Sequence, residues 1–416
     1  MQLTDEEKRM LDGDLGAGVQ KAMNMIVKVG ELFGAEKTIP ISSVQHLPVE
    51  PMDWLSEMAQ DGTKVRAFTG THSYYFDPTC WKSMGIDEKR AREEELTLDR
   101  HNEFYRRMGI LPLYTCAPYY VGNVPRYGSF FAWGGSAGQV LSNSLLGARG
   151  DRVGGPLCLA AAITGRAPYN GVMRPENRYG QFLVEIGDEL KAEDFSYAEY
   201  GALSYYLGAL AGTKNVVFDG VPKTITQEEL KYLFSPLPVS GGAVLCHVVG
   251  VTPEANTLEE ALHHRKPEQK IIAGKNHLRE GWEQLHTATG RDVDLVHFGC
   301  PHCSIKEIQY IAQWLDGKKI SPNVRLWIGT SSQTRLLAQK AGFSDILERA
   351  GAVLASICIP EASLYMKSWG INVKVLAVDS PRSAHYVYRT TGGSISIAYG
   401  NREMCLNAAI TGKWGG

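Results

Sequence analysis

Three short apolar runs of this sequence each end on a cysteine. The runs and their cysteines are residues 110–115 with Cys116, residues 294–299 with Cys300, and residues 352–357 with Cys358. In open α/β sheets, ligands collect in the crevice beyond the carboxyl ends of the strands, so cysteines placed there can converge although they are far apart in sequence. We therefore expect an α/β fold in which the three thiols meet in one crevice.

Three converging thiolates would form a metal site. Thiolates select zinc, copper(I) or iron–sulfur clusters, and closed structural sites normally use four protein ligands. Three ligands leave one metal position open, as a Lewis-acid catalyst requires. The competing interpretation is that each cysteine is a small buried hydrophobic residue. Because proline follows each of the three cysteines within two residues, their shared setting favours metal binding.

The remaining cysteines fit the simpler interpretation better. Cys158 and Cys246 lie in apolar runs, Cys405 lies in a predicted helix, and Cys80 is undecided. Cys303 completes half of a zinc-knuckle spacing with Cys300, but the second half is missing downstream. Eight cysteines without a secretory signal indicate reduced thiols or metal ligands rather than disulfides.

Strand and helix patterns alternate from residue 182 onward, which predicts mostly parallel sheets flanked by helices. The predicted strands are 182–185, 215–218, 242–249, 270–273, 292–298, 325–328, 352–357 and 373–378. The predicted helices between them are 197–212, 227–234, 258–263, 281–287, 306–315 and 334–341. Before residue 182 we predict a helix that covers residues 19–33, strands at 38–44 and 64–69, and helices at 54–59 and 87–108.

A polar stretch at residues 191–196 predicts the domain boundary. It would separate residues 1–190, with the first cysteine and a glycine-rich loop, from residues 191–416, with the second and third cysteines. The metal site would then lie in a cleft between the two portions.

The composition of the chain limits the kinds of partner that we expect. The 416 residues carry a net charge of −2 and no basic tract, which argues against nucleic acid as a partner and favours a small metabolite. The polar start and the lack of a long apolar segment predict a soluble, cytoplasmic protein that does not enter membranes.

The glycine-rich segment at residues 122–156 has the features of an anion pocket. Glycines let the backbone approach a ligand, and Ser136 begins a predicted helix whose first amides favour an anion. Arg149, Arg152 and Arg166 have the chemistry to clamp a carboxylate. The alternative is a glycine-rich bend with surface arginines paired to acids.

Three polar residues beyond that segment are further candidates. His302 follows Cys300 closely enough to orient the metal site or to serve as an acid–base group. Ser380 and Arg382 begin a predicted helix and are candidates for substrate binding.

Several motifs around these residues resemble the large subunit of the aconitase X family, a branch of the aconitase superfamily. They include Thr115-Cys-Ala-Pro-Tyr119, Gly122-Asn-Val-Pro125, Asn143-Ser-Leu-Leu-Gly-Ala-Arg149, Ala162-Ile-Thr-Gly-Arg166, Gly250-Val-Thr-Pro-Glu-Ala255 and Gly299-Cys-Pro-His302. The resemblance extends over nearly the whole chain and implies an aconitase-like α/β fold.

The resemblance also implies an activity. Members of the family remove water from small hydroxy acids such as mevalonate 5-phosphate or cis-3-hydroxyproline, with an iron or iron–sulfur centre held by three cysteines. Those cysteines carry over onto Cys116, Cys300 and Cys358. Tyr119, Asn123 and Asn143 of the shared motifs are then expected at the substrate, with Ser136, Arg149 and His302 in catalytic positions.

The family joins this catalytic portion to a small swivelling domain, which is fused in some members and a separate subunit in others. Nothing at either end of the chain resembles that domain, so we expect a heterodimer with a small subunit that closes over the substrate.

The chain departs from the family pattern in the expected pocket. Gly134 follows Trp133 where the family usually has an acidic residue, Gly150-Asp151 replaces threonine-asparagine, and Ser356-Ile357 replaces aspartate-threonine. The resemblance therefore supports the class of reaction more directly than it supports the identity of the substrate. Two alternatives stay open, a non-catalytic metal-binding subunit and an aconitase-type isomerase.

Overall fold

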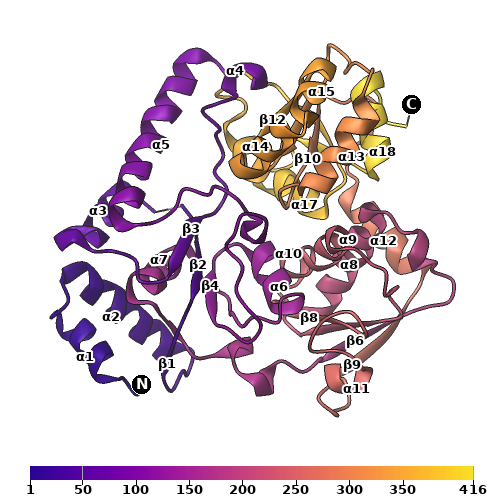
Figure 1. Cartoon of the computed structure of the whole chain (residues 1–416). Coiled ribbons are helices and arrows are strands. Elements are labelled where there is room, and N and C mark those ends of the chain that lie inside the picture. The colour runs from indigo at the N-terminus through magenta and orange to yellow at the C-terminus, as the bar shows by residue number, and fades with distance from the viewer. Residues whose placement is uncertain (49, 416) are drawn as a thin grey trace.

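Four β-sheets organise the residues that this computed structural model describes, 1–48 and 50–415. Three of the sheets are entirely parallel, and each is the centre of one lobe. We call these the N-terminal lobe (residues 1–178), the middle lobe (180–286) and the C-terminal lobe (293–415). Figure 1 shows them side by side, with the N-terminal lobe in indigo to magenta and the C-terminal lobe in orange and yellow.

The N-terminal lobe is built on the sheet β3-β2-β4, with a two-stranded antiparallel sheet of β1 and β5 beside it. Its helix α7 packs across β2, and eight of the ten residues of α7 are buried. The elements are α1 Asp5–Asp12, α2 Ala17–Leu32, β1 Thr38–Pro40, β2 Ser43–His46, α3 Met52–Met58, β3 Phe68–Thr71, α4 Trp81–Met84, α5 Glu88–Met108, β4 Phe131–Trp133, α6 Ser136–Ser144, α7 Gly155–Thr164 and β5 Arg166–Pro168.

The middle lobe has the strand order β8-β7-β6-β9. Capping boxes begin its two main helices, with Ser196 and Glu199 at α8 and Thr226 and Glu229 at α9. The elements are β6 Phe182–Ile186, α8 Tyr197–Ala211, β7 Val216–Asp219, α9 Gln227–Phe234, α10 Leu237–Ser240, β8 Cys246–Val248, α11 Leu258–Ala261, β9 Gln269–Ala273 and α12 Lys275–Leu285.

The C-terminal lobe has the strand order β12-β11-β10-β13-β14. The order reverses between β10 and β13, and such a switch point opens a crevice at the carboxyl ends of the two strands. The elements are β10 Leu295–Phe298, α13 Ile305–Leu315, β11 Arg325–Gly329, α14 Ser332–Lys340, α15 Phe343–Ala350, β12 Ala352–Ala355, α16 Ile359–Tyr365, β13 Val375–Val378, α17 Pro381–Thr390, β14 Ser396–Tyr399 and α18 Arg402–Thr411.

One hydrophobic cluster joins the three lobes. It combines Phe76 and Leu98 of the N-terminal lobe, Ala202 of the middle lobe, and Trp327 and Trp369 of the C-terminal lobe. Burial of this apolar surface fixes the lobes against one another, which is the condition for building a site between them.

The apolar run at residues 110–115 does not form a strand, although its position before Cys116 led us to expect one. This segment is irregular apart from a single bridge between Leu111 and Gly70, because Pro112 has no backbone donor and Tyr114 adopts a positive φ of 45°. Nevertheless it runs along the edge of β3, since the amide of Leu111 donates to the carbonyl of Thr69 (2.9 Å).

Other predicted elements differ in extent. The strand at 38–44 is divided into β1 and β2, the strand at 242–249 is shortened to β8, and β3 begins four residues later than predicted. The elements β14, α15 and α16 have no counterpart in the prediction. Strand β6 lies before residue 190 yet pairs with β7 and β9, so the boundary placed at residues 191–196 falls inside the middle lobe.

No helix in the described ranges combines the length and the apolar character that a bilayer crossing requires.

Candidate active site

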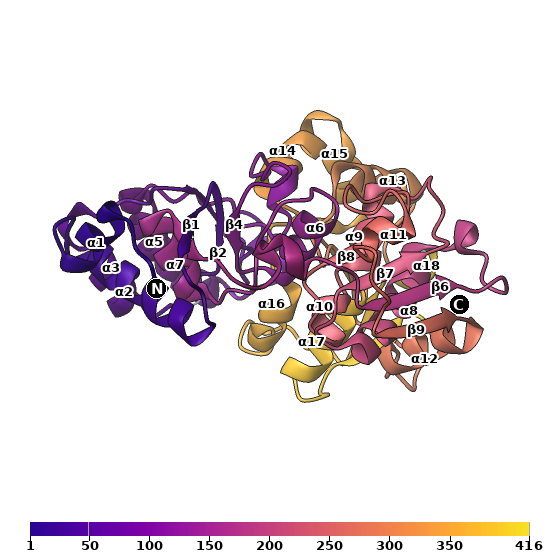
Figure 2. The same cartoon turned by 90° about the horizontal axis from the view of Figure 1, so that it is seen from below.

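A cavity of about 290 Å³ lies between the N-terminal and C-terminal lobes, and all three cysteines line it. Its N-terminal side is formed by Leu47, His72, Ser73, Cys116 and residues 134–137, and its C-terminal side by residues 299–302, 357–361, Leu364, Arg382, Tyr386 and Thr390. Figure 2 shows α16 and α17 next to each other near the middle of the molecule, where they form one wall. The predicted convergence of Cys116, Cys300 and Cys358 is therefore present in the structure.

Each cysteine reaches the cavity from a different element. Cys300 follows β10 at the switch point, and Cys358 is the residue that precedes α16, just after β12. Cys116 follows the irregular segment along β3, where the amide of Thr115 donates to the carbonyl of Thr71 (3.3 Å). Strand ends position two of the thiols, and the sheet edge positions the third.

The three thiols lie close enough to influence one another. Burial, together with the neighbouring Cys300, raises the pKa of Cys116 to about 12. Burial also raises the pKa of Cys358, and both other cysteines contribute in the same direction. In the part of the chain that the structure describes, no group of three His, Cys, Asp or Glu side chains is arranged to hold a metal ion.

His302 connects the loops of all three cysteines. Its backbone amide donates to Sγ of Cys116 (3.1 Å), its Nε2 lies 3.0 Å from the carbonyl of Ile357, and its Nδ1 lies 3.1 Å from Oγ1 of Thr115. Nε2 must donate to the carbonyl, so Nδ1 accepts from the threonine hydroxyl. Burial lowers the pKa of His302 to about 4, so the ring is neutral at pH 7.

A buried network of charged side chains holds the backbone of His302 in place. Nζ of Lys231 donates to the carbonyl of His302 (3.2 Å) and pairs with Glu307. Arg402 also pairs with Glu307 (3.0 Å) and with Asp379 (2.8 Å). These side chains come from α9, α13, α18 and the end of β13, so the network attaches the Cys300 loop to both the middle and the C-terminal lobe.

Arg382 and Ser136 face each other across the cavity wall. Both terminal nitrogens of the Arg382 guanidinium donate to Oγ of Ser136 (3.3 Å each), and Nη1 donates to the carbonyl of Ser235 (3.0 Å). Because a guanidinium binds carboxylates through two parallel hydrogen bonds, this pair offers a place for a substrate carboxylate. Two of the predicted polar residues are thus brought together.

The other predicted arginines lie outside the cavity lining. Arg166 pairs with Glu7 (2.9 Å) and Glu6 (3.2 Å) of α1, and Arg152 donates to the carbonyl of Gly242. The backbone of Arg149 pairs with Ser129 and Phe131. For Arg166 the structure matches the alternative of an arginine paired to acids, because α1 brings two glutamates to it.

The predicted polar motif residues also lie behind the lining. Asn143 ties α6 to the following loop, since its side chain donates to the carbonyls of Gly150 (2.8 Å) and Val244 (2.9 Å). Asn123 donates to the carbonyl of Val44 (3.0 Å), and Ser380 donates to the carbonyl of Cys300. Tyr119 is buried against Tyr120, with ring centroids 4.6 Å apart. These residues stabilise the segments that form the cavity walls.

Glu361 and His72 are among the lining residues that the sequence analysis missed. Burial raises the pKa of Glu361 to about 7. Burial lowers the pKa of His72 to about 3, and Ser73 hydrogen-bonds its Nδ1 (3.1 Å). Glu361 lies three residues after a predicted ligand cysteine, which is the signal that was available. The hydrophobic pattern of the short helix α16, which contains Glu361, did not indicate which face of the helix lines the cavity.

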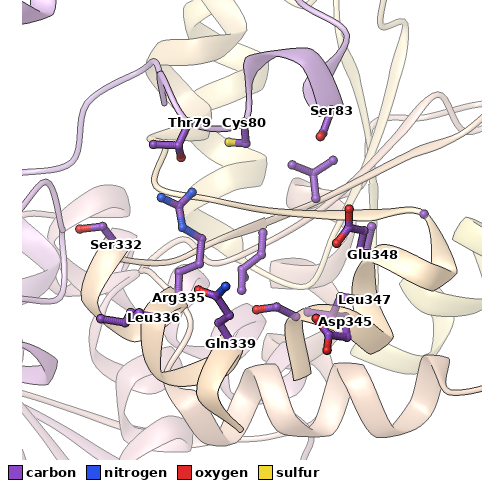
Figure 3. A pocket seen from close by; sticks show the side chains of 15 residues that line it. Thr79, Cys80, Ser83, Ser332, Arg335, Leu336, Gln339, Asp345, Leu347 and Glu348 are labelled. Atoms are coloured by element: carbon purple, nitrogen blue, oxygen red, sulfur yellow. The ribbon is translucent and has the colours of Figure 1, made fainter. Parts of the chain in front are cut away.

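A larger hollow of about 670 Å³ lies on another side of the C-terminal lobe (Figure 3). Arg335 of α14 points across it toward Thr79 and Cys80 and pairs with Asp77 (2.7 Å). It contains none of the three converging cysteines, so we do not assign the chemistry to it.

Comparisons with known proteins agree with this geometry. Family models of aconitase X match the chain in three parts, the first domain at residues 1–176, the second at 180–283 and the third at 293–411. The phosphomevalonate dehydratase large subunit of Methanocaldococcus jannaschii is 33% identical, over 98% of this chain and 99% of that protein. The enzyme of the same name from Methanothermobacter thermautotrophicus is 36% identical, over 92% of each.

More distant relatives and a solved structure extend the comparison. The cis-3-hydroxy-L-proline dehydratase of Hypocrea jecorina is 29% identical, over 99% of this chain and 69% of that enzyme. The crystal structure of Thermococcus kodakaraensis aconitase X in its holo form superposes with a TM-score of 0.84 at 30% identity, over 98% of this chain and 100% of that one. The three relatives matched by sequence are dehydratases, that is, hydro-lyases, and this chain belongs to the aconitase X family.

Proposed function

We propose that this chain is the large subunit of a hydro-lyase that removes water from a small hydroxy acid, with an iron–sulfur centre held by Cys116, Cys300 and Cys358. One observation carries the proposal. Three cysteines from three separate loops line the same small cavity as Arg382, and they lie among residues that the family models match. Named relatives with dehydratase activity support the reaction type.

The donor set fits an iron–sulfur centre. Thiolates are its ordinary ligands, and its several irons accept ligands that lie farther apart than those of a single ion. The lining offers three soft sulfur ligands from this chain, which would hold such a centre and would leave it open to a further ligand. When bound, such a centre supplies a Lewis acid that weakens the bond between the substrate carbon and its hydroxyl oxygen.

The residues of the chain orient the substrate for this elimination. Arg382 binds the carboxylate, with Ser136 as a further polar contact, and this fixes the carbon chain relative to the three thiols. His302 holds the cysteine loops in register through its hydrogen bonds to Thr115 and Ile357. The neutral ring has both nitrogens occupied, so we assign it a positioning role instead of proton transfer.

A small subunit completes the site. The relatives with the highest coverage are named large subunits, which implies a smaller partner. Leu364 of α16 and Thr390 of α17 line the cavity and are exposed. A domain that closes there excludes water and brings the group that removes the proton from the neighbouring carbon.

Activity of the reconstituted complex tests the proposal. The two subunits, loaded with iron and sulfide without oxygen, are incubated with 5-phosphomevalonate and with cis-3-hydroxy-L-proline, and loss of water is followed by mass spectrometry. We expect one of them to lose water. Arg382→Lys should raise the KM roughly 10- to 100-fold, because the two parallel hydrogen bonds to the carboxylate are lost. The exposed Arg279→Lys serves as the matched control. An iron-loaded complex that dehydrates neither compound would contradict the proposal.

A further inference from the structure

Cys300 lies against the first turn of helix α17. Ser380, which precedes the helix, donates to the carbonyl of Cys300 and accepts from the amide of Ser383 (3.3 Å). Arg382 and Ser383 belong to the same turn, and both side chains interact with the sulfur of Cys300. One turn of a single helix therefore surrounds a cysteine that we assign to the iron–sulfur centre.

The hydroxyl of Ser383 is buried without a strong hydrogen bond. The side chain is 0% exposed, and apart from its interaction with the Cys300 thiol its oxygen has no partner in the ranges that the structure describes. A neutral thiol is a weak acceptor, and a buried hydroxyl that lacks a good partner is unfavourable. A thiolate is a stronger acceptor because it is charged. The position of Ser383 thus suits the ionised, ligand form of Cys300.

The other side chains of this turn have acceptors of their own. The hydroxyl of Ser380 has a single proton, which it donates to the carbonyl of Cys300. The guanidinium of Arg382 donates to Ser136 (3.3 Å) and to the carbonyl of Ser235 (3.0 Å), and in the proposed function it also binds the substrate. Ser383 is therefore the side-chain donor of this turn that remains available to the sulfur.

A hydrogen bond to a ligand sulfur changes the reduction potential of an iron–sulfur centre. Reduction adds negative charge, part of which the sulfur ligands carry, so a donor beside the sulfur stabilises the reduced form more than the oxidised form. Cys116 has a donor of this kind in the backbone amide of His302 (3.1 Å), which no side-chain substitution removes. At Cys300 the donor is a side chain, so a substitution can delete it.

We propose that Ser383 is a positioning residue that donates a hydrogen bond to the Cys300 thiolate and raises the reduction potential of the centre. The inference rests on the iron–sulfur centre of the proposed function and goes beyond it, because Ser383 lies outside the cavity lining and does not contact the substrate. Its effect reaches the centre through Cys300 alone.

The midpoint potential of the iron-loaded complex, titrated with dithionite and redox dyes, tests the inference. At the potential that reduces half of the unmodified complex, the ratio of reduced to oxidised centre should fall at least 3-fold in Ser383→Ala, because the donor to Cys300 is lost. Ser142→Ala is the matched control and should change the ratio less than 1.5-fold. Ser142 is also 0% exposed and its hydroxyl is also unpartnered among the described residues, but it belongs to α6.

Urea unfolding of the iron-free chain is a second measurement. Because the hydroxyl of Ser383 makes no strong hydrogen bond there, Ser383→Ala and Ser142→Ala should both unfold at the same urea concentration as the unmodified chain. A much lower midpoint in Ser383→Ala alone would mean that the hydroxyl stabilises the fold through another partner, and would overturn the inference.

The outcomes separate the inference from the proposed function. An iron-loaded Ser383→Ala complex with an unchanged or higher potential would overturn the inference and leave the hydro-lyase proposal intact. A complex that takes up no iron would overturn both. A lowered potential in Ser383→Ala, in a complex that dehydrates no hydroxy acid, would support the inference and contradict the proposed reaction.

Discussion

At the scale of single residues, the most consequential contact of the site is the ring of His302. It joins Thr115, before the first cysteine, to Ile357, before the third, while its own backbone reaches Sγ of Cys116. Loss of the ring would leave a buried carbonyl without a donor and a buried hydroxyl without an acceptor, at a cost of about 1–3 kcal/mol each. The geometry therefore predicts that iron retention depends on this side chain.

Two substitutions separate positioning from proton transfer at residue 302. His302→Gln supplies an amide that can both donate and accept, so we expect it to keep most of the iron and most of the turnover. His302→Ala should lose more than half of the iron. Iron per chain and kcat are measured for both variants. If His302→Gln kept its iron yet lost more than 100-fold in kcat, the ring would transfer a proton and the positioning role would be wrong.

Sequence reasoning found the cysteines because their setting is repeated three times. The sequence could not show which arginines bind substrate, because the residue type is the same in both roles. Arg166, for example, pairs with two glutamates of α1. The sequence also showed that Gly134 replaces the acidic residue usual in the family, but it did not show a physical reason for the replacement. A side chain there would meet Leu47, whose Cγ lies 2.5 Å from the Cβ position, and the cavity has its carboxylate on Glu361 instead.

At the scale of elements, the site depends on how strands β10 and β13 end. The alternation of strands and helices after residue 182 was predicted well, because parallel strands are continuous apolar runs and capping residues mark the helices. The strand order is not encoded in that local pattern, so the switch point between β10 and β13 could not be predicted. For the same reason the pairing of β6 with β7, and with it the lobe boundary, was missed.

Gly299 tests how tightly β10 must turn into the Cys300 loop. Its φ is 104°, and a Cβ there would lie 2.1 Å from the carbonyl oxygen of Gly329. Gly299→Ala should cost more than about 3 kcal/mol and release iron, since it combines backbone strain with a clash against β11. Gly317→Ala is the matched control, with φ 73° and nothing within 4 Å, and should cost about 1–2 kcal/mol. Urea unfolding midpoints check both, and equal costs would contradict this account of the turn.

At the scale of the whole molecule, a site between lobes requires that the lobes stay in register. Asp77 of the N-terminal lobe accepts from Arg335 of α14 (2.7 Å) and from the amide of Ser356 (2.7 Å), two residues before Cys358. Burial alone would raise the pKa of Asp77, but Arg335 and the hydrogen bonds from Thr79 and Ser356 outweigh it and lower the pKa below its usual value.

An acid whose pKa is lower in the folded than in the unfolded protein stabilises the folded state at pH values above its unfolded pKa. This stabilisation is lost as the pH falls through the pKa of the folded state. Asp77→Asn should therefore cost about 2 kcal/mol at pH 7, and the difference from the unmodified protein should close as the pH falls below about 4. Urea midpoints between pH 7 and 3 measure this. The exposed Asp292→Asn should stay within about 0.5 kcal/mol throughout. A gap that widened toward low pH would contradict the assignment.

The central claim is that three thiols of this chain hold one iron–sulfur centre. The most direct measurement is the iron and acid-labile sulfide content, with the visible absorption spectrum, of protein purified without oxygen. We predict that the unmodified chain carries the centre, that Cys116→Ser, Cys300→Ser and Cys358→Ser each remove or degrade it, and that Cys246→Ser, buried in β8, keeps it. Full iron content in any of the three variants, or an unmodified chain that takes up no iron, would contradict the claim.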